Sequence, residues 1–260
     1  MSIRVIFVDI DWTVLDHAHG HVYDVESLNA LIEAQKKGIK VFYCTARPLY
    51  SLSHIGAFDV LKPDGIVSAN GGVVTIDNET IYKEYMPITT LEKACEVANK
   101  HGYNMLCAEV DDCFLLKEKD KYFDEYLKVY YEPIPRVSDY KGKEVISIIM
   151  FAPSSADEVM KSELPSDLEY YRYHEAAVEL VDRNHEKGTG VKEVLKYYGY
   201  SKEEAMSFGD DYGDIDMFNA TGLSVAMGNA KEDVKKAAKY VTSEVWNNGI
   251  KNALIDFKII

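Results

Sequence analysis

Cysteine is scarce in this chain of 260 residues, and its four cysteines form no recognisable metal or redox motif. Cys44, Cys95, Cys107 and Cys113 include no C-x-x-C pair, and no histidine stands near them at the spacing of a zinc site. Isolated thiols of this kind are typical of proteins in a reducing compartment. We therefore expect reduced cysteines in a cytoplasmic protein.

Basic residues and long apolar runs are also in short supply. Lysine and arginine number 29 against 43 aspartate and glutamate residues, which gives a formal net charge of −14. Nucleic acids and anionic membranes need a basic surface, so neither is expected as the main partner. Asp9 and Asp11 interrupt the first apolar run, which is too short and too charged for a signal peptide or a membrane span.

The composition that remains is that of a globular protein, with 47% apolar and 28% charged residues. Residues 3–8 are almost continuously apolar, a pattern typical of a strand buried on both faces of a parallel sheet. Residues 24–37 have helical spacing and stop before Gly38, and residues 39–44 form another buried strand. This strand, helix and strand predict a right-handed βαβ unit. The last third of the chain repeats the pattern, with predicted helices at 190–198 and 231–238 and predicted strands at 205–208, 224–227 and 240–241.

The middle of the chain has a different pattern, rich in tyrosine and without buried strands that end in aspartate. We predict helices at 91–100, 120–130 and 156–163, and strands at 113–117, 145–151 and 168–173. We therefore predict an α/β fold in which a Rossmann-like core of residues 1–81 and 179–260 is interrupted by an α+β domain of residues 82–178.

Two groups of aspartates follow apolar strands. Asp9 and Asp11 end the first strand, and Asp210, Asp211 and Asp214 follow a later one. Ligand sites of open parallel sheets lie beyond the carboxyl ends of the strands, so the two groups are candidates for one pocket. Such a pocket requires a cation, and oxygen ligands favour Mg²⁺ over zinc. For Asp9 and Asp11 the alternative is a solvated loop with turn-forming aspartates. For Asp211 and Asp216 the alternative is an exposed helix N-terminus.

Two further residues are candidates for phosphate binding. Thr45 ends the second strand, where its hydroxyl and the following N–H groups can hold phosphoryl oxygens; the alternative is a helix N-cap. Lys187 precedes a glycine-rich helix start and can neutralise a transferring phosphate; the alternative is an ordinary surface lysine.

The order of these elements carries a resemblance to a known family. Asp-x-Asp-x-Thr, the Thr45 strand end, Lys187 before glycine, and Gly-Asp-Asp-x-x-Asp resemble the haloacid dehalogenase (HAD) superfamily. The insertion and the Asn70-Gly71-Gly72 turn resemble its Cof-type subfamily with a C2 cap of the C2B kind. The resemblance extends over the whole chain.

The resemblance implies a role for each matching residue. Asp9 is expected to be the nucleophile and Asp11 the general acid and base. Thr45 and Lys187 complete the expected catalytic set. The expected metal ligands are Asp9, Asp11 through its backbone carbonyl, Asp210 and, in support, Asp214. The expected substrate-binding residues are Thr45, Ala46, Arg47, Asn70, Gly71, Lys187 and Asn229.

The function implied is a Mg²⁺-dependent phosphatase that hydrolyses small phosphomonoesters, sugar phosphates foremost, through an aspartyl-phosphate. A phosphosugar mutase and a non-catalytic phosphosugar-binding protein are the alternatives. Trp12 departs from the family pattern, since glycine is usual there, and Gly213 stands where many Cof-type members have asparagine. The specific substrate and the oligomeric state stay open. Residues 170–174 (Tyr-Tyr-Arg-Tyr-His) form a possible substrate-contact patch, with sheet packing as the alternative.

Overall fold

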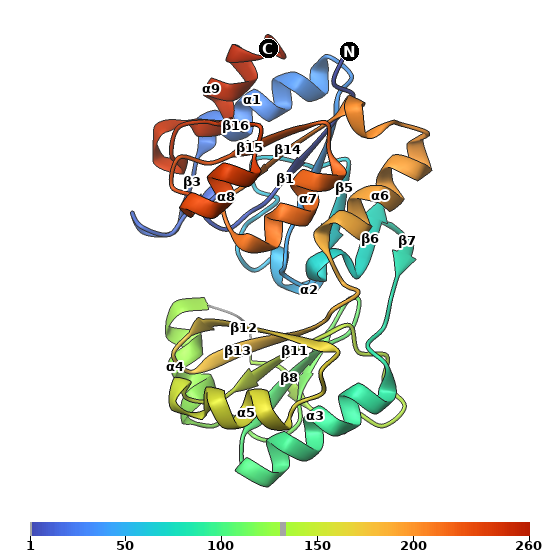
Figure 1. Cartoon of the computed structure of the whole chain (residues 1–260), viewed down its shortest axis with the longest axis vertical. Coiled ribbons are helices and arrows are strands. Elements are labelled where there is room, and N and C mark those ends of the chain that lie inside the picture. The colour runs from blue at the N-terminus through green and yellow to red at the C-terminus, as the bar shows by residue number, and fades with distance from the viewer. Residues whose placement is uncertain (1, 131–133) are drawn as a thin grey trace. The chain divides into compact units, whose positions relative to one another are not determined.

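A computed structural model describes residues 2–130 and 134–260, apart from the side chains of residues 129, 130 and 173. Its contacts divide the chain into two units (Figure 1). The first unit contains residues 1–47, 56–83 and 186–260, and the second contains residues 48–55 and 84–185. Within the described residues, no helix has the length and apolar character needed to cross a membrane.

The first unit is built on an eight-stranded sheet in the order β16-β15-β14-β1-β4-β5-β6-β7. Neighbouring strands from β16 to β5 run parallel, and β6 and β7 are added antiparallel. The strands are β1 (Val5–Val8), β4 (Lys40–Cys44), β5 (Gly65–Ser68), β6 (Val73–Ile76), β7 (Glu79–Lys83), β14 (Ala205–Gly209), β15 (Leu223–Ala226) and β16 (Tyr240–Val241). The central strands β1 and β14 are buried at every position, as their apolar sequences predict.

Helices cover both faces of this sheet (Figure 1). On one face α1 packs with α9, and on the other α6, α7 and α8 enclose a core that includes Phe7, Phe42, Val191 and Met217. The helices of this unit are α1 (Val25–Lys36), α6 (Lys187–Tyr198), α7 (Ile215–Ala220), α8 (Glu232–Ala237) and α9 (Gly249–Asp256). Its 3₁₀ turns are η1 (Ala69–Gly71), η3 (Lys202–Glu204), η4 (Tyr212–Asp214) and η5 (Val245–Asn247).

A short hairpin leaves the sheet directly after β1. It consists of β2 (Leu15–Asp16) and β3 (Val22–Tyr23), which pair antiparallel, and its tip contains three histidines within the sequence HAHGH. The sequence analysis did not predict this hairpin, because each strand is only two residues long. It also missed β7 and α9.

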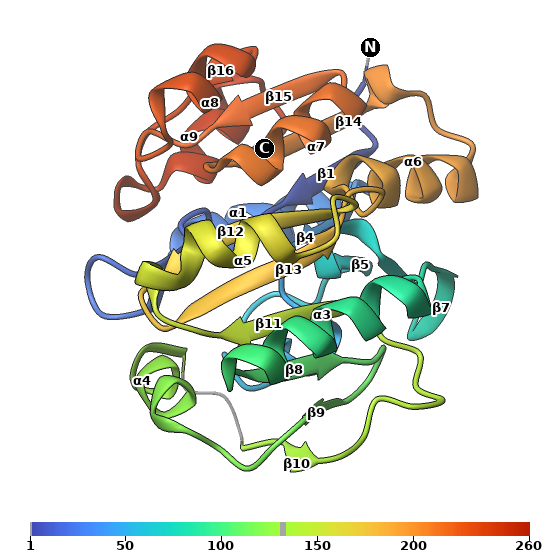
Figure 2. The same ribbon diagram turned by 60° about the horizontal axis from the view of Figure 1, so that its bottom comes forward.

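The second unit is a mainly antiparallel sheet in the order β10-β9-β8-β11-β13-β12 (Figure 2). Its strands are β8 (Asn104–Ala108), β9 (Cys113–Leu115), β10 (Arg136–Val137), β11 (Ser147–Phe151), β12 (Leu168–His174) and β13 (Ala177–Asp182). Its helical segments are α2 (Leu49–Leu52), α3 (Ile88–His101), α4 (Lys121–Tyr130), η2 (Ser154–Ala156) and α5 (Asp157–Glu163).

Alternation along β11 explains how both faces of the second sheet are covered. Ile148 and Met150 pack in a cluster with residues of α3 and α5, whereas Ile149 and Phe151 pack with Phe123 of α4. Side chains of a strand point alternately to opposite faces, so one strand supplies both clusters. The continuous apolar run that predicted β11 reflects this burial on both sides.

The observed division differs from the predicted one at its second boundary. The expected break between residues 178 and 179 falls inside β13, which pairs with β11 and β12 of the second sheet. The second unit therefore continues to His185. The sequence analysis predicted no strand at residues 177–182, so its boundary fell within this element.

Candidate active site

The site begins where β1 and β14 end. These strands are parallel neighbours with Val8 opposite Phe208, so the residues that follow them meet at the carboxyl edge of the sheet. The Asp9 N–H donates to the Phe208 carbonyl at 3.0 Å, and Asp210 follows directly after β14. The two aspartate groups therefore meet at one place.

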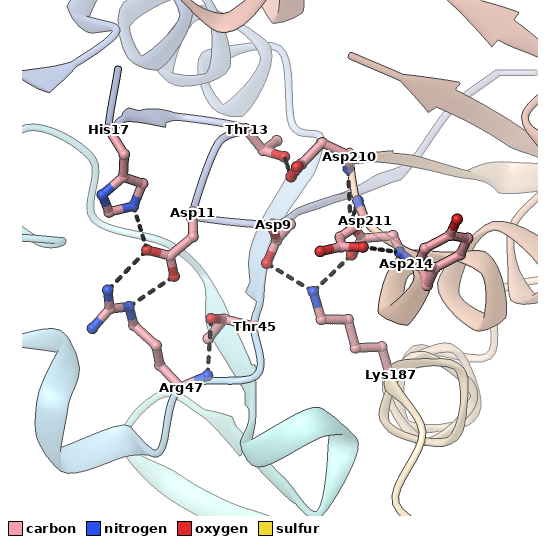
Figure 3. Close-up of polar contacts among 11 residues, drawn as sticks. Asp9, Asp11, Thr13, His17, Thr45, Arg47, Lys187, Asp210, Asp211 and Asp214 are labelled. Atoms are coloured by element: carbon pink, nitrogen blue, oxygen red, sulfur yellow. Dashed lines mark hydrogen bonds and ion pairs between the residues drawn. The ribbon is translucent and has the colours of Figure 1, made fainter. Parts of the chain in front are cut away.

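Three buried carboxylates form what we call the acidic cluster: Asp9, Asp210 and Asp214, whose oxygens lie within 4.8 Å of one another. Lys187, the first residue of α6, extends into this cluster (Figure 3). Its Nζ lies 2.8 Å from Asp9 Oδ1 and 2.6 Å from Asp214 Oδ1, and the residue is only 4% exposed. Lys187 is thus not a surface lysine.

Burial and mutual repulsion alter the acid–base behaviour of the cluster. Burial raises the pKa of Asp9 above its usual range, opposed by Lys187 and reinforced by Asp214 and Asp11. Burial likewise raises the pKa of Asp210 well above its usual range, with Asp214 and Asp9 adding to the effect. Burial alone would lower the pKa of Lys187, but Asp214 and Asp9 raise it well above its ordinary value. One lysine does not offset three carboxylates, so the cluster favours a further cation.

The hydrogen bonds show which oxygens are open to such a cation. Asp214 Oδ1 faces Lys187, and its Oδ2 accepts the N–H groups of Asp210 at 2.8 Å and Asp211 at 3.0 Å. Thr13 donates to Asp210 Oδ1 at 3.0 Å. Among the described residues, Oδ2 of Asp9 and Oδ2 of Asp210 receive no donor in these contacts. Asp214 therefore orders the cluster, while Asp9 and Asp210 can offer oxygens to a metal ion.

Asp11 belongs to a separate group, which we call the Asp11 network: Asp11, Arg47, His17 and His21. Arg47 Nε lies 2.8 Å from Asp11 Oδ2, and Arg47 Nη2 lies 2.8 Å from Oδ1. His17 Nε2 lies 2.7 Å from Oδ1, and the ring of His17 contacts His21. Burial alone would raise the pKa of Asp11, but Arg47 and His17 lower it well below its usual range.

Asp9 and Asp11 are two residues apart, and their side chains would point the same way only if the strand continued past them. In the structure β1 ends at Val8, and Asp11 turns toward Arg47 and His17 while Asp9 faces Lys187 (Figure 3). The chain turns here: the N–H groups of Thr13, Val14 and Leu15 donate to the Ile10 carbonyl, and Trp12 adopts a left-handed conformation with φ of 62°. The Asp11 carboxylate consequently lies outside the acidic cluster.

Thr45 and Arg47 lie next to this site, at the end of β4. The Thr45 hydroxyl oxygen is buried and accepts the Arg47 N–H at 3.1 Å in a turn. The alternative of a helix N-cap is not observed, because the next helix, α2, begins at Leu49 after Pro48. Ala46 between them is half-buried. The Arg47 guanidinium is engaged by Asp11, so substrate binding by Arg47 would require it to exchange that partner.

The turn at Asn70 and Gly71 packs against the same loop. The Asn70 N–H donates to the Thr45 carbonyl at 3.2 Å, and Asn70 has a left-handed φ of 52°. A Cβ on Gly71 would stand 2.1 Å from the carbonyl oxygen of Glu186, the residue before Lys187. Glycine at this position thus lets the start of α6 approach closely.

Asn229 supports the loop that follows Asp11. Its Nδ2 donates to the Trp12 carbonyl at 2.8 Å, and its Oδ1 accepts the Val245 N–H at 2.9 Å. The amide thereby holds the left-handed turn at Trp12 in place. Gly213, the other departure from the family pattern, borders open space, because a Cβ there would meet nothing within 4 Å.

The structure also adds site residues and qualifies one predicted patch. Thr13 and His17 contact the predicted aspartates but received no role from the sequence; the final position of Asp-x-Asp-x-Thr was the one available signal for Thr13. In the second unit, Arg172 pairs with Asp157 and donates to the carbonyls of Ala152 and His174, so Arg172 stabilises its own sheet. The side chain of Tyr173 lies outside the described residues.

Comparisons with known proteins agree with this geometry. The family model of haloacid dehalogenase-like hydrolases matches residues 6–254. A phosphoglycolate phosphatase of Sulfolobus acidocaldarius is 26% identical over 93% of this chain and 91% of its own length. The Bacillus subtilis 5-amino-6-(5-phospho-D-ribitylamino)uracil phosphatase YcsE is 24% identical over 98% of this chain and 95% of its own length.

A solved structure extends the likeness to three dimensions. The HAD subclass IIB sugar phosphatase BT4131 is 30% identical and superposes with a TM-score of 0.84, covering 99% of this chain and 100% of that one. The predicted resemblance, the α/β fold with an inserted domain, and the prediction of a phosphatase-type hydrolase are confirmed at the level of the family. The chain belongs to the haloacid dehalogenase-like hydrolases.

Proposed function

We propose that this protein is a Mg²⁺-dependent phosphatase that hydrolyses small phosphomonoesters through an aspartyl-phosphate on Asp9. The observation that supports this most is the ion pair of Asp9 with Lys187 inside the buried acidic cluster, at the carboxyl edge of a parallel sheet. A nucleophilic carboxylate, a fixed positive charge and metal-ligating oxygens are thereby within reach of one phosphoryl group.

The donor set of the acidic cluster fits magnesium. It contains only oxygen ligands, and its carboxylates outnumber the single lysine by three to one. Mg²⁺ prefers a few carboxylates together with water and substrate oxygens, whereas zinc sites use nitrogen and sulfur. We assign Asp9 and Asp210 as carboxylate ligands, the Asp11 carbonyl as a further ligand, and Asp214 as a supporting residue. The ion would neutralise charge on the phosphoryl oxygens.

Asp9 and Lys187 have different roles in the first step. The Asp9 carboxylate attacks phosphorus, the bond from phosphorus to the leaving oxygen breaks, and the phosphoryl group stays on Asp9. The Lys187 ammonium orients Asp9 and offsets negative charge as the new bond forms. The Arg47 guanidinium is proposed to contact the phosphate. The proposed substrate-binding residues remain Thr45, Ala46, Arg47, Asn70, Gly71, Lys187 and Asn229.

Asp11 is the proposed acid in the first step and the base in the second. Its contacts with Arg47 and His17 favour the ionised form, which can take a proton from the attacking water. An incoming phosphate competes for the Arg47 guanidinium, because phosphate is a strong bidentate partner of arginine. Asp11 is then released from its ion pair and can carry the proton that the leaving oxygen needs.

Sugar phosphates are the proposed substrate class, and the second unit is the proposed cap that chooses among them. BT4131 is a sugar phosphatase, whereas the two phosphatases from Sulfolobus and Bacillus act on a phosphoglycolate and on a phosphoribityl compound. Relatives of similar sequence identity thus differ in substrate, so the site residues that they share do not determine which substrate is used.

A turnover screen tests the proposal. Purified protein is incubated with phosphorylated metabolites, with and without Mg²⁺, and free phosphate is measured. Mg²⁺-dependent release of phosphate is expected. An isomerised sugar without free phosphate would identify a mutase, and binding without either product would identify a phosphosugar-binding protein.

A further inference from the structure

The histidines of the β2–β3 hairpin are not used by the proposed function, although one of them contacts Asp11. We propose that His17 is a positioning residue that holds the Asp11 carboxylate for proton transfer, and that His21 holds the His17 ring in place. This inference rests on the proposed function and assigns a task to residues outside its catalytic set.

The contacts of His17 show which of its ring nitrogens donates to Asp11. Its Nε2 lies 2.7 Å from Asp11 Oδ1, and an ionised carboxylate can only accept, so Nε2 carries the hydrogen. The other ring nitrogen, Nδ1, lies 2.6 Å from His21 Nδ1. This second contact ties the His17 ring to His21 while Nε2 faces Asp11.

The two oxygens of Asp11 are not equivalent in this network. In the contacts among the described residues, Oδ1 receives His17 Nε2 and Arg47 Nη2, whereas Oδ2 receives Arg47 Nε. When a phosphate draws Arg47 away, His17 still holds Oδ1, and Oδ2 becomes open to the reacting oxygen. A proton on Oδ2 then passes to the leaving oxygen as its bond to phosphorus breaks. In the second step Oδ2 takes a proton from water as the water oxygen bonds to phosphorus and the Asp9–phosphorus bond breaks.

The surroundings of His17 suit a residue with a fixed position. Its side chain is 12% exposed, its ring centroid lies 5.2 Å from that of Trp12, and the ring of His21 meets it edge-on at 4.7 Å. His19 offers a matched contrast on the same hairpin. It makes an equally short contact of 2.7 Å, but with Asp16, and its side chain is 62% exposed.

The experiment compares a donor-free ring, a flexible donor and a hairpin control. His17→Phe keeps a ring but removes the donor, His17→Gln retains an N–H donor, and His19→Phe makes the same change at the control position. Single-turnover rates of phosphoryl transfer are measured with a sugar phosphate and with p-nitrophenyl phosphate, whose leaving group needs no proton. His17→Phe removes the charge-assisted hydrogen bond to Asp11. We therefore expect the single-turnover rate with the sugar phosphate to fall about ten-fold.

Further readouts separate positioning from a general structural effect. We expect KM to stay within about two-fold, p-nitrophenyl phosphate to be little affected, His17→Gln to recover to within about three-fold of the parent, and His19→Phe to match the parent. Imidazole ¹⁵N NMR of the full chain should show a slowly exchanging Nε2–H on His17 that exchanges faster in Asp11→Ala.

The possible failures are distinguishable. A parent protein without phosphatase activity overturns the proposed function and the proton-transfer role of His17 together. An active parent whose rates are unchanged in His17→Phe overturns the role of His17 alone. Equal losses in His17→Phe and His17→Gln, or for both substrates, would assign His17 to the stability of the hairpin and also overturn it. A His17 NMR signal that is insensitive to Asp11→Ala would exclude the contact itself.

Discussion

Asp9 and Asp11 are separated by one residue, yet the structure places them in opposite electrostatic surroundings. Asp9 lies in the acidic cluster, where other carboxylates and burial raise its pKa and Lys187 alone opposes them. Asp11 lies between Arg47 and His17, which lower its pKa. One site thus holds a carboxyl group that favours the protonated form, Asp9, and another that favours the ionised form, Asp11.

This difference shows how identical side chains can serve different steps. A carboxylate in an acidic cluster needs a cation to remain ionised, so its reactivity is coupled to metal binding. A carboxylate beside a guanidinium is ionised without a metal, and its proton affinity changes when that partner moves. Environments that separate the pKa values of neighbouring acids are a common basis for acid and base assignments.

The largest expected effect comes from removing the Asp9 carboxylate. Asp9→Asn should lower turnover by ~10⁴-fold or more, because an amide cannot form the aspartyl-phosphate. Beryllium fluoride should label Asp9 in the parent. Asp16→Asn, which changes another buried carboxylate of the same loop, is the control and should retain activity. Substantial turnover by Asp9→Asn protein would exclude the covalent mechanism.

The second effect tests whether Asp11 acts separately from the metal. Asp11→Asn should slow the first step by ~10²–10⁴-fold for a sugar phosphate and less for p-nitrophenyl phosphate, because only the alkoxide needs a proton. The Mg²⁺ concentration for half-maximal activity should change little, since the backbone carbonyl remains. Single-turnover measurements check both points. An equal loss for the two substrates would mean that Asp11 places the metal or Asp9 instead.

A third prediction concerns the balance of activity and stability in the acidic cluster. Asp210→Asn should raise the Mg²⁺ concentration needed for half-maximal activity at least about ten-fold, whereas Asp216→Asn, outside the cluster, should raise it less.

The same substitution should also change stability. Because the folded-state pKa of Asp210 lies above its unfolded value, its ionisation destabilises the metal-free fold as pH rises above about 4. Metal-free Asp210→Asn protein should therefore be more stable than the parent at pH 7, by ~1–3 kcal/mol.

Denaturant unfolding at two pH values checks the sign of this prediction. The stability difference between Asp210→Asn and the parent should shrink toward pH 4, because the folded parent keeps its proton there and the unfolded chain increasingly gains one. Addition of Mg²⁺ at pH 7 should stabilise the parent more than the variant. A metal-free variant less stable than the parent at pH 7 would show that the cluster is not under electrostatic strain.

The smallest effect is expected at Trp12, the left-handed residue that follows Asp11. Its φ of 62° is unfavourable for any residue with a Cβ, and the family pattern has glycine there. Trp12→Gly should unfold with a free energy ~1 kcal/mol higher than Trp12→Ala, since both lose the indole and only glycine relieves the conformation. Thermal or urea unfolding of the pair measures this, and equal stabilities would contradict the left-handed turn.

The sequence predicted the site residues of the core better than their arrangement. Asp9, Asp210 and Lys187 were identified because each follows or begins an element whose pattern is strong, and β1 and β14 are parallel neighbours in the sheet. The side chains of Asp9 and Asp11 diverge because β1 ends at Val8. The carbonyl of Trp12, the residue after Asp11, accepts a hydrogen bond from Asn229, which lies 217 positions further along the chain.

The predicted elements of the second unit were less complete. The run at 145–151 predicted β11, but β8 and β13 were missed, and the boundary at 178/179 fell within β13. Apolar strands have the same local pattern in either sheet, and only their pairing partners distinguish them. Pairing is a long-range property that a short sequence window does not contain.

The sequence alone determined the family, the alternation of strands and helices, and the identity of the aspartates and lysine at the carboxyl edge, because these depend on local patterns and their order along the chain. The tertiary structure alone decided that Asp214 is saturated by Lys187 and backbone N–H groups, that Arg47 binds Asp11, and that His17 stands beside them. Each of these contacts depends on how a side chain is directed by its loop. That direction follows from backbone turns and distant hydrogen bonds, such as the one that fixes Trp12, and not from the residue type itself.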